Sequence, residues 1–223
     1  MVSGNHNSKL NNKLSNKIGI IDYGMGNLWS VASALEFLDA QFIISSDPAE
    51  LKKVDALILP GVGSFRRAML SLQESGLEDI IKESVHIQQK NILGICLGMQ
   101  LLCNSSNEDG MTKGLGLIDG KINNFDQKLT KLQKIPHIGF NTVDIPHDSN
   151  LYKGFNKNAD FYFVHSYRLL SENLPGNLAT CEHGEIFVAS YEDKNIFASQ
   201  FHPEKSQTNG LMFLKNFLQI SKC

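Results

Sequence analysis

Ile92-Leu93-Gly94-Ile95-Cys96-Leu97-Gly98-Met99-Gln100 is an apolar run in which two glycines flank one cysteine. The pattern predicts a buried strand over Asn91–Ile95, a tight turn at the cysteine and a helix that starts at Leu97. A side chain on such a turn projects from the carboxyl end of a sheet, and the helix N-terminus favours a thiolate there. Cys96 is therefore a candidate nucleophile, although a free cysteine is also a common buried apolar residue.

The segments around this turn alternate between short apolar strands and helices. Strands are predicted at Lys17–Tyr23, Gln41–Ser45 and Ala56–Leu59, and helices at 28–38, after Asp47-Pro48, at 66–88 with a break at Gly76, and at Leu97–Cys103. Because strands that alternate with helices form βαβ units, the pattern predicts an α/β fold with a mostly parallel sheet.

The second half of the chain has a different pattern of predicted elements. Further strands, mostly antiparallel, are predicted at 120–125, 161–168, 178–182, 186–191 and 196–201, and a closing helix at Asn209–Ile220. Residues 1–17 are rich in Asn, Ser and Lys, so we expect a flexible, solvated tail there and a single domain over residues 18–223.

Composition excludes several classes of function. The 223 residues are 42% hydrophobic and 20% charged, with a formal net charge of -2, so the chain can bury a core and offers no basic surface for nucleic acid. No apolar run approaches the roughly 18–20 residues that span a bilayer, and no secretory signal is present, so we expect a cytoplasmic protein. The four cysteines and seven histidines lack the spacing of a disulfide framework or metal site, and no cofactor is expected.

A thiol nucleophile needs a base, and the base needs an acceptor that orients it. His202 and Glu204 follow the predicted strand at 196–201 and stand two residues apart, with Pro203 holding the backbone between them. His202 could accept the proton of Cys96 while Glu204 fixes its tautomer. A lone histidine is more often structural, but here both segments follow strands that could end at one edge of the sheet.

The third candidate segment is a glycine-rich turn, Gly61-Val62-Gly63, which follows the predicted strand at Ala56–Leu59. Backbone N–H groups in such a turn can face a developing oxyanion, although the segment also fits a plain turn. A phosphate-binding loop fits poorly, because the lysine that follows its second glycine is missing.

Together these motifs resemble a known family, the triad glutamine amidotransferases. Five further segments are similar to the glutaminase subunits of imidazole glycerol phosphate synthase, and the resemblance covers about residues 18–220. These segments are Asp22–Leu28, Pro60–Phe65, Pro136–Asn141, Phe163–Tyr167 and His202–Ser206.

The resemblance implies a flavodoxin-like α/β fold and a Cys96-His202-Glu204 triad that releases ammonia from L-glutamine. It implies a heterodimer with a (β/α)8-barrel cyclase, which uses the ammonia to make imidazole glycerol phosphate and an aminoimidazole carboxamide ribonucleotide in histidine biosynthesis. The residues that it implies are Gly61, Val62, Gly63 and Leu97 for the oxyanion hole, Gly98, Gln100, Glu108, Ser166 and Tyr167 for glutamine, and Asn27, Phe140, Tyr162 and Lys205 for the partner interface.

Two positions depart from the family pattern. Phe140 stands where the family usually has Trp, and Ile138 where it usually has Met. Phe keeps an aromatic face but lacks the indole N–H, and aromatic anchors contribute strongly to interfaces. Three alternatives therefore stay open: the same glutaminase chemistry feeding a sugar amidotransferase for surface polysaccharides, an α/β hydrolase or thiol protease, and a binding module with a vestigial site.

Overall fold

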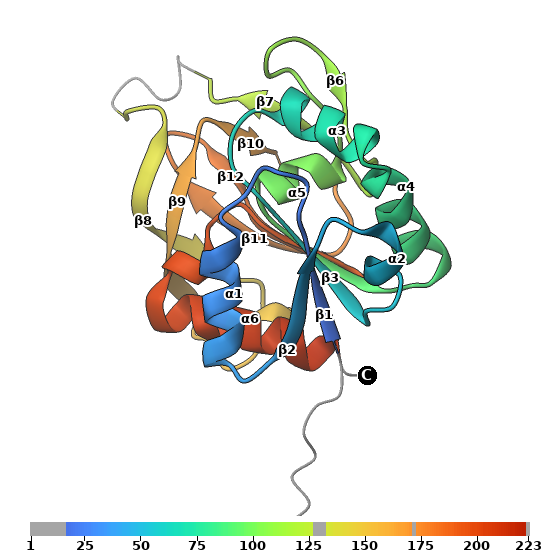
Figure 1. The fold of residues 1–223 in the computed structure, drawn as a ribbon. Coiled ribbons are helices and arrows are strands. Elements are labelled where there is room, and N and C mark those ends of the chain that lie inside the picture. The colour runs from blue at the N-terminus through green and yellow to red at the C-terminus, as the bar shows by residue number, and fades with distance from the viewer. Residues whose placement is uncertain (1–16, 127–132, 171–172, 222–223) are drawn as a thin grey trace, which may run out of the picture.

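A nine-stranded sheet runs through the centre of the protein (Figure 1). The computed structural model describes residues 17–126, 133–170 and 173–221. Five parallel strands form one half of the sheet, in the order β2-β1-β3-β4-β13. Their bounds are Lys17–Ile21 (β1), Gln41–Ser45 (β2), Ala56–Gly61 (β3), Asn91–Cys96 (β4) and Ile196–Ser199 (β13). This order of parallel strands is that of the flavodoxin-like fold, so the predicted fold class is confirmed.

The other half of the sheet consists of four strands in the order β12-β11-β8-β9, and neighbours among them pair antiparallel. These strands are β12 (Ile186–Asp193), β11 (Asn177–Glu182), β8 (His137–Asp144) and β9 (Asn158–His165). A second sheet has the order β10-β7-β5-β6, with bounds Tyr167–Leu169 (β10), Ile118–Asn124 (β7), Cys103–Ser106 (β5) and Thr112–Lys113 (β6).

Helices cover both faces of the large sheet (Figure 1). Helices α1 (Leu28–Phe37) and α6 (Gln207–Ile220) pack on one face, and α2 (Pro48–Leu51), α3 (Phe65–Glu74), α4 (Leu77–Lys82) and α5 (Leu97–Leu102) on the other. Successive side chains along a strand point to opposite faces of the sheet, so each buried strand contributes to both cores. In β3, Ala56 and Ile58 belong to the core under α1 and α6, whereas Leu57 and Leu59 belong to the core on the other face. The remaining turns of helix are η1 (Glu83–Ile87), η2 (Asn150–Tyr152) and η3 (Pro203–Lys205).

Local signals in the sequence explain several boundaries. The Asp47 side chain accepts a hydrogen bond from the Ala49 N–H at 2.8 Å and caps α2. Gly76 adopts φ 69°, which glycine tolerates, and separates α3 from α4 at the predicted break.

Other boundaries differ from the sequence-based expectation. The helix predicted over Leu97–Cys103 ends at Leu102, because Cys103 starts β5 and pairs with Ile118. The predicted strand at 161–168 divides at Ser166 into β9 and β10, which belong to different sheets. Strand β8 was not expected at all.

Two expectations concern the tail at the start of the chain and membrane-spanning helices. The tail predicted at residues 1–17 lies outside the described residues, apart from Lys17, which begins β1. Within the described ranges, no helix is long and apolar enough to cross a membrane.

Candidate active site

Three neighbouring parallel strands deliver the predicted catalytic segments to one edge of the sheet. In the ladder, Gly61 at the end of β3 pairs with Cys96 at the end of β4, and Ser199 of β13 pairs with Ile95. The glycine turn, the cysteine and the histidine follow these three strand ends, so segments far apart in sequence meet where α/β sheets usually bind ligands.

The backbone of Cys96 is strained, with φ 55° and ψ -107°. Two glycines make this turn possible because the backbone passes very close to its neighbours there. A Cβ on Gly94 would lie 2.8 Å from the carbonyl carbon of Gly98, and a Cβ on Gly98 would overlap the Leu59 carbonyl oxygen. Strained non-glycine residues concentrate at functional sites, where the surrounding fold holds them in place.

His202 and Glu204 form a buried pair. The ring Nδ1 and a carboxylate oxygen of Glu204 lie 2.7 Å apart, and the two side chains are 2% and 1% exposed. Nδ1 therefore donates to the carboxylate, so Nε2 is the atom that can take or give a proton. Within the described residues, this Nε2 is buried without a hydrogen-bond partner.

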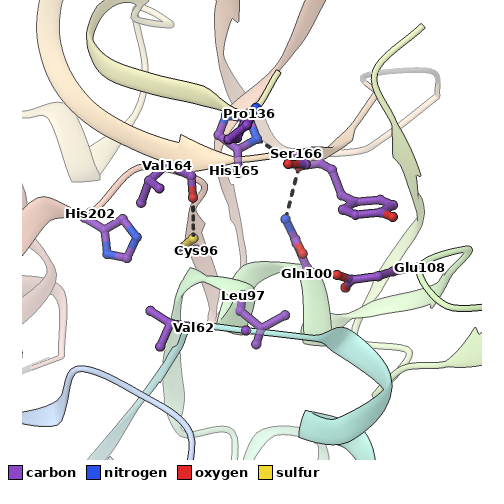
Figure 2. Close-up of a pocket in the computed structure, with 12 residues that line it drawn as sticks. Val62, Cys96, Leu97, Gln100, Glu108, Pro136, Val164, His165, Ser166 and His202 are labelled. Atoms are coloured by element: carbon purple, nitrogen blue, oxygen red, sulfur yellow. Dashed lines mark hydrogen bonds between the residues drawn. The ribbon is translucent and has the colours of Figure 1, made fainter. Parts of the chain in front are cut away.

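The charged form of His202 is favoured. Burial alone would lower the pKa of the ring, but interactions with Cys96 and Glu204 outweigh it and raise the pKa to about 10. Figure 2 shows the His202 ring on one side of Cys96 and Gln100 on the other. A positive imidazole next to a thiol is the arrangement that stabilises a thiolate.

A cavity of about 300 Å³ opens at Cys96 (Figure 2). Val62, Gly63 and Leu97 line it, and Leu97 is the first residue of α5, where the backbone N–H groups lack helical acceptors. Gly61 and Gly98 do not line the cavity: Gly61 continues β3, and Gly98 packs against Leu59.

The remaining residues expected to bind glutamine lie at the same cavity. Gln100, Glu108, Ser166 and Tyr167 all line the cavity. A carboxylate oxygen of Glu108 accepts a hydrogen bond from the Phe65 N–H at 2.8 Å, at the start of α3. Burial raises the pKa of Glu108, and the nearby Asp109 raises it further, against that hydrogen bond.

Sequence reasoning missed several residues of this site. Pro136, Val164 and His165 line the cavity, and Gln200 lies buried beside Cys96. Gln200 directly precedes Phe201-His202, so its place at a strand end was the available signal. For Val164 and His165 the available signal was the segment Phe163–Tyr167, which resembles the family, although the strand break at Ser166 that follows them was not predicted.

A buried histidine pair supports the wall behind Tyr167. The Tyr167 carbonyl can only accept, so His165 donates to it from Nδ1 at 2.8 Å, and His165 Nε2 then accepts from His137 Nδ1 at 3.0 Å. Burial lowers the pKa of His165 to about 3 and that of His137 to about 4, so both rings are neutral.

The residues expected at a partner interface lie on separate elements. Phe140 of β8 is 51% exposed and pairs with Tyr162 of β9, with ring centroids 5.6 Å apart. The Tyr162 carbonyl accepts from the His202 N–H at 2.9 Å, which connects this pair of strands to the loop that carries His202. Lys205 is exposed in η3, and Asn27 precedes α1, which packs against η3.

A thiol on a strand-to-helix turn, beside an imidazole held by a carboxylate, is an arrangement found in α/β enzymes that form acyl intermediates on sulfur. The model of the class-I glutamine amidotransferases matches residues 19–220, and the chain belongs to this family. The predicted enzyme class, a glutamine amidotransferase, is confirmed.

Two curated relatives carry the name of a subunit of one synthase. A protein of Campylobacter jejuni is 47% identical over 203 residues, which are 91% of this chain and 100% of that protein, and is named imidazole glycerol phosphate synthase subunit HisH 1. One of Bacillus licheniformis, named subunit HisH of the same synthase, is 45% identical over 92% of this chain and 97% of its own. The predicted resemblance to these glutaminase subunits is confirmed.

Solved structures show the same fold at low identity. A crystal structure titled glutamine amidotransferase has a TM-score of 0.70 at 18% identity and covers 92% of this chain and 99% of its own. The structure of PurLQS from Thermotoga maritima gives 0.66 at 17% identity, with 92% and 98% covered.

Proposed function

We propose that the chain hydrolyses the side-chain amide of L-glutamine with a Cys96-His202-Glu204 triad and supplies the ammonia to a cyclase in histidine biosynthesis. The observation that carries the chemistry is the buried His202 ring, whose Nδ1 is held by Glu204 while its Nε2, without a hydrogen-bond partner among the described residues, lies at the cavity of Cys96. The pathway is supported by the names of relatives that are 43–47% identical over more than nine tenths of the chain.

In the first half of the reaction, the Cys96 thiolate attacks the amide carbon of glutamine. A C–S bond forms and the carbonyl electron pair moves to oxygen, where the N–H of Leu97 and one from the 61–63 turn stabilise the charge. His202 gives its Nε2 proton to the amide nitrogen, the C–N bond breaks, and ammonia leaves behind a glutamyl thioester.

In the second half, water attacks the thioester while His202 Nε2 takes one of its protons. The C–S bond breaks, glutamate leaves, and the thiolate is restored beside the imidazolium. Glu108 would meet the substrate's α-ammonium group, because its carboxylate is fixed at the cavity wall by the Phe65 N–H.

The partner would be a (β/α)8-barrel cyclase that docks on the face with Asn27, Phe140, Tyr162 and Lys205. Exposed apolar side chains on β8 support this, since Ile138 and Phe140 are 60% and 51% exposed. The cyclase would combine the ammonia with a phosphoribulosyl formimino ribonucleotide to give imidazole glycerol phosphate and the carboxamide ribonucleotide.

The test is glutamate release by the purified chain, alone and with a cyclase of imidazole glycerol phosphate synthase plus its nucleotide ligand. Strong stimulation by the cyclase supports both the chemistry and the pathway. Glutamate release that the cyclase leaves unchanged would retain the chemistry and contradict the proposed partner.

A second candidate uses the same chemistry for a sugar amidotransferase. The specific observation in its favour is Phe140, an exposed aromatic residue without the indole N–H of the usual Trp at the proposed interface. The two candidates differ in the acceptor, so incubating the chain with each synthase and isotopically labelled glutamine decides which product gains nitrogen.

A further inference from the structure

Gln200 occupies a position beside the nucleophile that the mechanism above does not use. It follows Ser199, the last residue of β13, and Ser199 pairs with Ile95 on the adjacent β4. Its backbone N–H donates to the Ala189 carbonyl at 2.8 Å, and its side chain is fully buried. The side-chain Nε2 lies 3.7 Å from the Cys96 sulfur.

The orientation of this amide follows from a neighbouring carbonyl. The Tyr167 carbonyl can only accept, so the Gln100 group that contacts it at 3.1 Å is the NH₂. The same Gln100 NH₂ lies 3.1 Å from the other end of the Gln200 side chain, which must therefore be the oxygen. The Gln200 NH₂ is then the group that faces the sulfur.

We propose that Gln200 is a catalytic residue that donates a hydrogen bond from its side-chain amide to the Cys96 sulfur and stabilises the thiolate. The inference rests on the proposed role of Cys96 as the nucleophile. A buried thiolate loses its water and needs donors from the protein. His202 supplies positive charge on one side of the sulfur and Gln200 supplies a donor already in position, so neither has to reorganise during the reaction.

The neutral thiol of Cys96 makes hydrogen bonds with the same neighbouring residues. Its S–H donates to the Val164 carbonyl at 3.8 Å, while the Gln200 NH₂ donates to the sulfur. When the thiol loses its proton, the contact with Val164 loses its donor and the contact with Gln200 strengthens, because hydrogen bonds to charged acceptors are stronger. Gln200 therefore favours the charged form over the neutral one.

The test measures how the rate of Cys96 alkylation by iodoacetamide depends on pH. Burial raises the pKa of Cys181 to about 12 and that of Cys103 further, so these thiols contribute little, and Cys96→Ala gives the background from other sites. Gln200→Met keeps the length of the side chain but removes the donor. Gln200→Glu keeps an acceptor for Gln100 and puts an acceptor against the sulfur. Ser199→Ala is the matched control, because Ser199 is the fully buried neighbour of Gln200 at the end of β13 and donates to the Phe201 carbonyl at 3.1 Å, away from the cysteine.

We expect the midpoint of the alkylation profile to rise by about one pH unit in Gln200→Met and by more in Gln200→Glu, with no shift in Ser199→Ala. An unchanged midpoint in folded Gln200→Met overturns the proposal, since a purely structural role would lower only the melting temperature. If both Gln200 variants fail to fold, the native protein with ¹⁵N-labelled glutamine side chains gives the answer. One side-chain amide signal should titrate with the alkylation profile and stop doing so in Cys96→Ala, and its absence would overturn the proposal.

Alkylation needs neither glutamine nor a partner. A failure of the proposed function would leave wild-type chain without glutamate release, whereas a failure of this inference would leave that release intact and the alkylation midpoint unmoved by Gln200→Met. The two failures are therefore distinguishable.

Discussion

Replacing Glu204 by Gln keeps the size of the side chain but removes the charge that holds His202. The carboxylate is 2.7 Å from the ring Nδ1, and both side chains are almost fully buried, so water cannot substitute for the lost partner. An amide at this position can present its NH₂ to Nδ1, which would move the ring proton to Nε2 and leave no acceptor for the thiol proton. The imidazolium that forms during the reaction also loses its counter-charge.

The size of the effect follows from the burial of this pair. Where the buried acid that orients a triad histidine is replaced by its amide, kcat falls by about 10⁴-fold, and each ~1.4 kcal/mol is tenfold in rate, so kcat for glutamate release should fall by roughly 10²- to 10⁴-fold. The pKa of His202, raised to about 10 partly by Glu204, should fall in the variant. The alkaline limit of its residual activity should therefore lie at lower pH than in the native enzyme.

The assay is glutamate release with the cyclase and its ligand present, and Glu192→Gln is the matched control. Glu192 is also a buried carboxylate and accepts from the N–H groups of Asn150 and Leu151, but it does not line the cavity. Glu192→Gln should lose about 1–3 kcal/mol of stability in urea and keep its kcat. The reasoning is refuted if folded Glu204→Gln keeps kcat within threefold of the native value.

Two further substitutions test the turn and the substrate wall. Gly98→Ala should lower the melting temperature in a calorimetric scan by roughly 10 °C, or about 3 kcal/mol of stability, because the added Cβ overlaps the Leu59 carbonyl. Gly26→Ala is the control and should melt like the native chain, because the nearest neighbour of its Cβ would be 3.4 Å away. Equal melting temperatures of the two variants would contradict this reasoning. Glu108→Gln should raise the KM for glutamine by about 10- to 100-fold with little change in kcat, because it keeps the Phe65 hydrogen bond but not the charge. Since burial raises the pKa of Glu108, the native KM should rise as the pH falls, starting at a higher pH than for an ordinary glutamate, and a parallel rise in Glu108→Gln would rule out this assignment.

Much of the parallel half of the fold could be predicted from the sequence, for a physical reason. Strands buried on both faces are continuous apolar runs, as in β3 and β4, and glycines mark the points where the backbone must pass closely. The Cys96 turn carries both signals, so its place at a strand end was predictable without any long-range information.

Strand β8 was missed because its pattern of buried and exposed residues is the reverse of the usual one. Ile138 and Phe140 are exposed while His137 is buried, so apolar side chains face outward and a polar one faces inward. Likewise, β5 has the sequence Cys-Asn-Ser-Ser and forms through pairing with β6 and β7 rather than through propensity.

The cavity wall also contains residues that the sequence alone could not place in the site. His165 and Gln200 belong to the site through contacts across strands and through hydrogen bonds to Tyr167 and Gln100, which only the folded chain brings together. The spacing of His202 and Glu204, in contrast, is local, so the sequence alone was enough to propose that they act as a pair.

The most direct test of the account is to look for a glutamyl group on Cys96. Acid-quenched mixtures of enzyme, cyclase and glutamine should contain the peptide that carries Cys96 with one added glutamyl mass. Cys96→Ala should release no glutamate while still binding the cyclase. Glutamate release by Cys96→Ala at a rate close to that of the native enzyme, or a glutamyl group on another peptide, would contradict the central claim that this cysteine is the nucleophile.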